Sequence, residues 1–167
     1  TGLIGFQFMV SIVLIICACF VTMQRQYMLH YDMGFDRSQL LQVYTSSHIA
    51  NMRKTTTSEL KSNPAIKDVT FANGDIVSNY RMGWGRQFKG EQINFMCYPV
   101  QWNFLDFMGI DIIEGRNFTE SDEICENGVF IFNEAARDKF GLTLDDKMLG
   151  HQGETEIAGI CKNFNYR

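Results

Sequence analysis

The hydrophobic pattern of the chain is dominated by its first stretch. Residues Leu3 to Met23 form a run of 21 residues without Asp, Glu, Lys, Arg or His. As an α-helix this run is roughly 30 Å long, which matches the hydrocarbon thickness of a bilayer. A buried core helix would be shorter and amphipathic, and a secretory signal would carry Lys or Arg before a shorter apolar run. The pattern predicts a transmembrane helix that continues as a stalk to about Asp32 and ends at Gly34.

The polar positions of this helix fall on one side. At about 100° per residue, four small or polar residues lie within a sector of about 60°. They are Gln7, Ser11, Ala18 and Thr22. Such a face in lipid commonly packs against another helix, so we interpret these residues as a candidate helix-packing face. The alternative is that the Ser and Thr hydroxyls bond to their own helix backbone.

After the helix, short apolar stretches of period 2 and of period 3.6 are interspersed without regular βαβ spacing. Strands are predicted at 40–44, 66–73, 91–100, 110–115, 128–133 and 154–164, and helices at 49–61, 102–109 and 134–140. Residues 74–90, 115–128 and 143–150 are predicted as loops or turns because they are rich in Gly or polar residues. This order predicts an α+β domain with a mixed or antiparallel sheet. We therefore divide the chain into a helix and stalk (1–32) and a domain of one or two lobes (33–167).

Some single positions sharpen the prediction. Ser46 or Ser47 could begin the helix at 49–61, whose sparse apolar stripe is Ile49, Met52 and Leu60. Asn133 is a good N-cap for the helix 134–140, and Gly141 is a good stop. Trp84 lies in a flexible Met-Gly-Trp-Gly context, where it is either a binding tip or folded back onto the core.

Composition and cysteine content exclude some classes. The chain has 15 basic and 19 acidic residues, all after position 24, and a net charge of −4. Nucleic-acid surfaces need clustered Lys and Arg, so no nucleic-acid partner is predicted. Cys17 and Cys19 lie in the apolar run, and Cys97, Cys125 and Cys161 are scattered without a Cys-x-x-Cys motif. An odd number of cysteines outside the helix allows at most one internal disulfide.

The sequence offers little catalytic chemistry. His30, His48 and His151 are isolated, and neither a Gly-x-Ser-x-Gly motif nor a phosphate-binding loop is present. An acidic group at 120–126 (Glu120, Asp122, Glu123 and Glu126) lacks the spacing of a calcium loop and is interpreted as solvated. We predict no catalytic residue, no cofactor and no metal site, and do not expect an enzyme.

Several stretches taken together resemble a known family. FQFMVSIVLII, QRQYMLHYDMGFDRSQLL, LKSNPAIKDV, WNFLDFMGIDIIEGRNF, VFIFNEAARDKFG and IAGICKNFNYR occur in this order. They resemble FtsX-like, MacB-like permease subunits of bacterial ABC transporters, in the form common in Bacteroidetes. The motifs GRNF, FNEAA and GICKNF carry the resemblance in combination. The sequence departs from the family at DDKMLG, where a Pro-Ile-Gly-Lys-like turn is frequent, and at Asn163, where Asp is usual.

The resemblance implies a function. It implies a membrane helix and a periplasmic core domain, cut from a longer permease of the bacterial inner membrane. Implied partners are a separate cytoplasmic ABC ATPase, membrane lipid, and other permease helices or a second permease copy. The implied role is to couple ATPase motion to the periplasmic domain for export or mechanotransmission. A membrane-anchored sensor or ligand-binding ectodomain is the alternative, and an anchored enzyme is a third.

Overall fold

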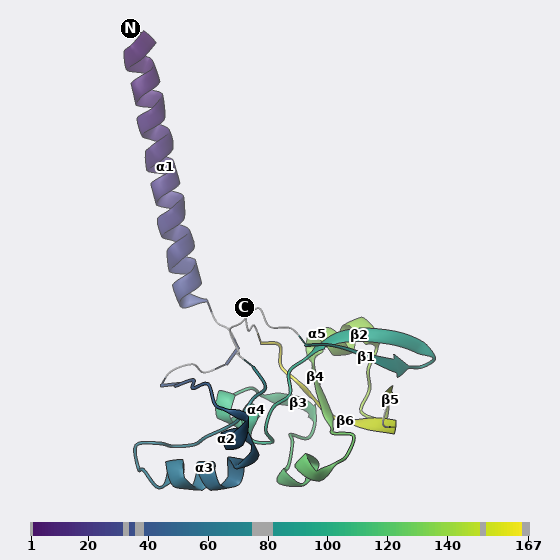
Figure 1. Cartoon of the computed structure of the whole chain (residues 1–167). Coiled ribbons are helices and arrows are strands. Elements are labelled where there is room, and N and C mark those ends of the chain that lie inside the picture. The colour runs from purple at the N-terminus through teal and green to yellow at the C-terminus, as the bar shows by residue number, and fades with distance from the viewer. Residues whose placement is uncertain (1, 32–33, 36–38, 75–81, 151–152, 165–167) are drawn as a thin grey trace. The chain divides into compact units, whose positions relative to one another are not determined.

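The structure is a computed structural model that describes residues 2–31, 34–35, 39–74, 82–150 and 153–164 (Figure 1). The chain divides into two compact units, Thr1–Asp32 and Met33–Arg167. The first unit consists of one long helix, α1 (Gly2–His30), which has no buried residue. The second unit contains all of the strands and five shorter helices among the described residues.

The elements of the second unit alternate between helix and strand, as an α+β fold requires. In chain order they are α2 (Ser47–Asn51), α3 (Arg53–Lys61), β1 (Met82–Phe88), β2 (Glu91–Cys97), α4 (Phe104–Met108), β3 (Ile112–Gly115), the 3₁₀ helix η1 (Glu120–Ile124), β4 (Phe130–Asn133), α5 (Glu134–Phe140), β5 (Lys147–Gly150) and β6 (Gly153–Cys161).

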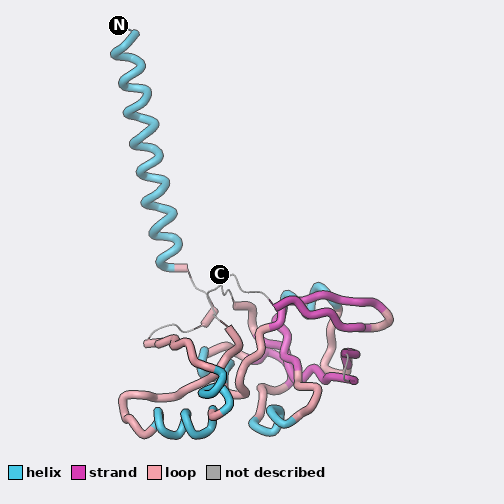
Figure 2. The backbone as a smooth tube through the Cα atoms, in the orientation of Figure 1, coloured by secondary structure: helices cyan, strands magenta, loops and turns pink. Residues whose placement is uncertain are grey.

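The strands form one mixed sheet organised around β6. Its order is β2-β1-β5-β6-β3, and β4 also pairs with β6. The pairing of β4 with β6 is parallel, whereas β3 and β5 are antiparallel to β6. In Figure 2 the strands gather on one side of the domain, and α2 and α3 lie among loops on the other side. The predicted α+β class with a mixed sheet is confirmed.

Two apolar clusters form the core. The first cluster packs the inner face of the β1–β2 hairpin against β4 and β6, and its aromatic rings meet edge to face. The ring centroids of Phe95 and Phe132 are 5.0 Å apart, and those of Phe95 and Phe130 are 5.5 Å apart. The second cluster surrounds α4 with Phe104, Leu105 and Met108. Aromatic burial of this kind dominates the stability of small domains.

Predictions that rested on local signals are confirmed. The side chain of Asn133 accepts a hydrogen bond from the N–H of Ala136 at 3.0 Å and caps α5. Gly109 and Gly141 end α4 and α5 in the left-handed conformation. In β2 the predicted alternation holds, because Phe95 is buried while Met96 is exposed. The strands predicted at 110–115, 128–133 and 154–164 correspond to β3, β4 and β6.

Three predictions before residue 74 are wrong. Residues 40–44 form no strand, and Leu41 and Tyr44 are exposed. The helix predicted at 49–61 is broken at Met52 into α2 and α3, and its apolar stripe is exposed. Residues 66–73 also form no strand, apart from one bridge between Ala72 and Val100. Strand propensity alone does not create a ladder, because pairing also needs a neighbouring strand.

Two stretches predicted as loops are strands instead. Residues 82–88 of the predicted loop 74–90 form β1, since β2 and β5 pair with its two edges. Residues 147–150 of the predicted turn form β5, which is paired with β6. The alternatives for Trp84 are also resolved, because its ring packs edge to face on Phe130 at 6.1 Å and is folded back onto the core. Residues 75–81 lie outside the described residues.

Candidate functional site

The apolar helix α1 is the first candidate. It is the one helix among the described residues that is long and apolar enough to cross a membrane, by length and composition. Its large side chains are exposed along its whole length. Exposed apolar side chains in this density are stable in lipid or against other helices rather than in water.

The predicted packing face on α1 consists of two pairs of residues, each pair one helical turn apart. The hydroxyl of Ser11 donates to the carbonyl of Gln7 at 2.9 Å, and that of Thr22 donates to the carbonyl of Ala18 at 2.8 Å. Both hydroxyls are therefore satisfied within the helix, as the alternative interpretation expects. Among the described residues, no hydrogen bond involves the side-chain amide of Gln7. The packing role of the four residues stays a prediction.

The motif GRNF at 115–118 forms a junction between β3 and β6. Gly115 has φ +75°, and a Cβ at this position would lie 2.3 Å from the carbonyl oxygen of Ala158. A Cβ at Gly159 would lie 2.4 Å from the carbonyl oxygen of Arg116. The two backbones touch here because neither glycine has a side chain. The N–H of Arg116 then donates to the carbonyl of Ala158 at 2.9 Å.

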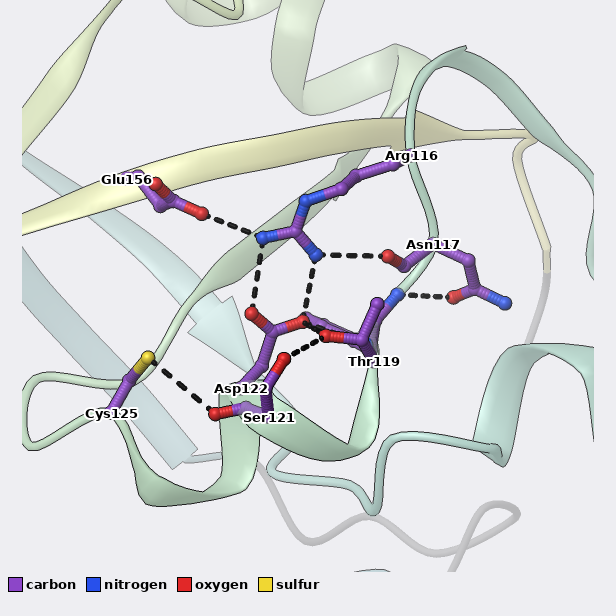
Figure 3. Close-up of polar contacts among 8 residues, drawn as sticks. Arg116, Asn117, Thr119, Ser121, Asp122, Cys125 and Glu156 are labelled. Carbon is purple, nitrogen blue, oxygen red and sulfur yellow. Dashed lines mark hydrogen bonds and ion pairs between the residues drawn. The ribbon is translucent and has the colours of Figure 1, made fainter.

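The Arg116 side chain binds two carboxylates (Figure 3). Its guanidinium contacts Asp122 in bidentate fashion at 2.7 and 3.0 Å, and Glu156 of β6 at 2.7 Å. The Asp122 carboxylate also accepts hydrogen bonds from the N–H of Thr119 at 2.7 Å and from its hydroxyl at 2.9 Å. Bidentate, charge-assisted bonds are the strong class of polar contact. This Arg116 clamp fastens η1 to β3 and β6.

The electrostatics of the clamp hold Asp122 ionised. Its side chain is 11% exposed. The hydrogen bond from Arg116, reinforced by those from Thr119, lowers the pKa of Asp122 to about 2. A carboxylate with such a pKa exchanges no proton near neutral pH, so it serves as a structural anchor and not as a general acid or base.

The other residues of GRNF are also engaged. The side chain of Asn117 donates to Asp106 of α4 at 2.8 Å and accepts from the N–H of Phe118 at 2.7 Å. Phe118 packs on the second core cluster. The motif therefore joins the sheet, α4 and η1 at one point.

The motifs FNEAA and GICKNF meet each other. The side chain of Asn163 accepts from the N–H of Ala135 at 3.0 Å, and the N–H of Asn163 donates to the Glu134 carboxylate at 3.1 Å. Asn163 thus binds the first turn of α5, where an acceptor is needed for free N–H groups. An Asp at this position would offer the same acceptor oxygen.

The remaining candidate groups are paired or dispersed. Within the acidic group at 120–126, Glu120 binds Lys54 at 2.8 Å and Asp122 binds Arg116. No three His, Cys, Asp or Glu side chains converge as metal ligands in the described part of the chain. His30 and His48 lie on α1 and α2, and His151 lies outside the described residues.

The five cysteines are free thiols. Burial raises the pKa of both Cys97 and Cys161 to about 11, which keeps them as thiols. Cys125 is exposed, and its Sγ lies 3.8 Å from the carbonyl oxygen of Ser121. The structure therefore contains no disulfide among these residues.

Sequence reasoning recognised the three motifs but missed their contacts. Arg116 and Glu156 are 40 residues apart, and Glu134 and Asn163 are 29 apart. No local signal announces such pairs; only the motifs hinted that these residues matter. The resulting arrangement positions backbone and charge and presents no activated nucleophile.

Comparison with known proteins bears on the fold. No protein-family profile matches the sequence, and no curated protein matches it significantly. The structure is similar to that of the periplasmic region of MacB from Actinobacillus actinomycetemcomitans, with a TM-score of 0.53 and 16% sequence identity. The match covers 78% of this chain and 58% of that chain. The chain thus combines an apolar helix with a domain whose fold is similar to a MacB periplasmic region.

Proposed function

We propose that this chain is a membrane helix and the periplasmic domain of a permease subunit of a bacterial ABC transporter, of FtsX-like or MacB-like type. The observation that carries the proposal is the MacB-like fold of a domain that follows an apolar helix in the sequence. In this proposal α1 crosses the inner membrane and the domain lies in the periplasm. A separate cytoplasmic ATPase subunit hydrolyses ATP, and this chain has no enzymatic activity.

The proposed mechanism is transmission of motion. Movement of α1, driven by the ATPase, would reach the domain through the short stretch after His30. The domain suits this role because its charges are engaged in fixed pairs, such as those of Arg116 and Arg137 with carboxylates. A domain held together in this way moves as a unit rather than deforming. Export of a substrate or activation of a periplasmic partner would follow from that displacement.

The first experiment tests the location of the domain. Ser58 is exposed on α3, and Ser58→Cys is placed in the full-length protein after its native cysteines are replaced. A maleimide that crosses the outer but not the inner membrane should label it in intact cells. Val13→Cys on α1 is the matched control and should stay unlabelled. Protection of Ser58→Cys until the inner membrane is lysed would contradict a periplasmic domain.

The second experiment tests coupling and separates a permease from an anchored sensor. The full-length protein is purified with its associated proteins and reconstituted in lipid. Replacing Met28 and Leu29 by two glycines softens the end of α1, whereas two alanines keep it helical. We expect the glycine variant to lose transport-coupled ATPase activity and the alanine variant to retain it. Equal activity in both variants would contradict the mechanism, and purification without any ATPase would favour a sensor.

A further inference from the structure

The outer edge of β2 is a free sheet edge. Within the described residues β2 pairs with β1 alone and forms one end of the sheet order. Figure 1 shows the β1–β2 hairpin, with β2 along its outer margin. A free edge presents a row of backbone donors and acceptors that can pair with another strand.

The hairpin register identifies which backbone groups are free. The turn residues Lys89 and Gly90 have φ values of 50° and 85°, as in a type I′ two-residue turn. The flanking pair Phe88 and Glu91 is therefore hydrogen-bonded, and hydrogen-bonded pairs alternate along the ladder. The N–H and C=O groups of Gln92, Asn94 and Met96 consequently point away from β1. These three residues define the β2 outer edge.

The other sheet edges are protected, whereas this one is not. β3 and β4 have four residues each, and the register of each against β6 is interrupted by a bulge. β2 has seven residues, and its register with β1 is continuous. Its sole charged residue is Glu91 at one end, and Pro99 comes after its other end. Charges, bulges, prolines and short length are the means by which natural edges avoid pairing.

The exposed face of the hairpin is also low and uncharged. Gly83 and Gly85 of β1 lie opposite Met96 and Asn94 of β2, so this face has side chains mainly on β2. A Cβ at Gly85 would lie 2.8 Å from the side-chain nitrogen of Gln92, which shows that this side chain covers the glycine. Glycines in a strand frequently mark a place where another chain comes close.

We propose that the β2 outer edge pairs antiparallel with the same edge of a second copy of this chain. Pairing centred on Asn94 places Asn94 opposite Asn94 of the second copy and Gln92 opposite Met96. No like charges meet in this register, and each pair exchanges backbone hydrogen bonds. A second copy carries the same edge in the same compartment, and two-fold self-complementary contacts are the commonest form of oligomer. The inference does not depend on the proposed transport function.

Cross-linking in the full-length protein tests the pairing. Asn94→Cys, with the native cysteines replaced, brings two thiols together across the two-fold axis, since opposed Cα atoms of a hydrogen-bonded pair are about 5.5 Å apart. A short bis-maleimide should then produce a cross-linked species of twice the protomer mass. Ser58→Cys, which is equally exposed but distant in the fold, should give no such species. Equal cross-linking at both positions, or none at Asn94→Cys, would overturn the proposal.

A charge at the same position provides the second test. The reporter pair Gln92→Cys and Met96→Cys also faces itself across the interface. Adding Asn94→Lys places two like charges opposite each other and should abolish the cross-linked dimer, whereas Asn94→Ser should retain it. Asn94 is exposed, so circular dichroism should show both proteins folded. A dimer that persists with Asn94→Lys, or a cross-linked product of another mass, would exclude this pairing.

Discussion

At the scale of single residues, Gly115 is fixed by two independent constraints. Its φ of +75° is in the left-handed region, and the space for a Cβ is occupied by the carbonyl oxygen of Ala158. The first constraint penalises any side chain, and the second cannot be relieved without moving β6. Gly128 has a similar φ of +66° but nothing within 4 Å of a Cβ. The two glycines therefore separate backbone strain from steric contact.

Gly115→Ala should destabilise the domain more than Gly128→Ala. We expect the strain alone to cost about 1 kcal/mol at Gly128. At Gly115 the added contact should raise the cost to about 2–4 kcal/mol. Urea unfolding followed by circular dichroism measures both free energies of unfolding. Similar losses for the two variants would show that β3 and β6 can separate to admit the methyl group.

The Arg116 clamp should give the domain an acid-sensitive component of stability. The pKa of Asp122 in the folded protein is about 2, below its ordinary value of 3.8. Its contribution is therefore complete above pH 4 and is lost as the pH falls through about 2. Because Arg116 is 44% exposed, solvent screening reduces the contribution to about 1 kcal/mol.

The measurement is urea unfolding of the wild-type protein and of Asp122→Asn from pH 5 to pH 2. The wild-type protein should lose more stability than the variant as the pH falls, and the two should converge at the acid end. Parallel curves would mean that other carboxylates carry the acid sensitivity. Rescue is not expected from Arg116→Lys, because an ammonium cannot make the bidentate contact.

At the scale of elements, the two faces of β2 should respond differently to truncation. Phe95 is 9% exposed and packs on two other phenylalanines, whereas its neighbour Met96 is 54% exposed. Phe95→Ala should cost about 3–5 kcal/mol, and Met96→Ala should stay within about 0.5 kcal/mol. Thermal and urea unfolding test the difference. A large loss for Met96→Ala in a dilute, monomeric sample would mean that its side chain has a partner within the domain.

The elements also show what a sequence can predict. Asn133, Gly109 and Gly141 act on their own turns, so the limits of α4 and α5 followed from the sequence. β1 was not predicted, because Gly83 and Gly85 weaken a strand that exists only through pairing with β2 and β5. The strand predicted at 40–44 failed for the opposite reason, since suitable side chains found no ladder. The Arg116 clamp depends on contacts between segments far apart in sequence, which no local pattern encodes.

At the scale of the whole molecule, the packing face of α1 makes a prediction about assembly. Ala18 lies at the centre of that face, and Val13 lies on nearly the opposite side of the helix. Ala18→Leu should weaken association of the full-length protein with its membrane partners, because small residues allow close approach of helices. Val13→Leu adds apolar volume toward lipid and should have no effect. Co-purification in mild detergent measures both, and equal behaviour of the two variants would remove the predicted face.

The central position of β6 has a consequence for the birth of the protein. Residues 153–161 come after every other described strand, yet β3, β4 and β5 all pair with them. During synthesis and translocation these three strands must wait until the final strand has emerged, so the sheet closes late and through contacts distant in sequence. A nascent chain halted before Gly153 should be digested readily by protease, and one released beyond Phe164 should resist. Chaperones on the far side of the membrane would meet the first form and not the second.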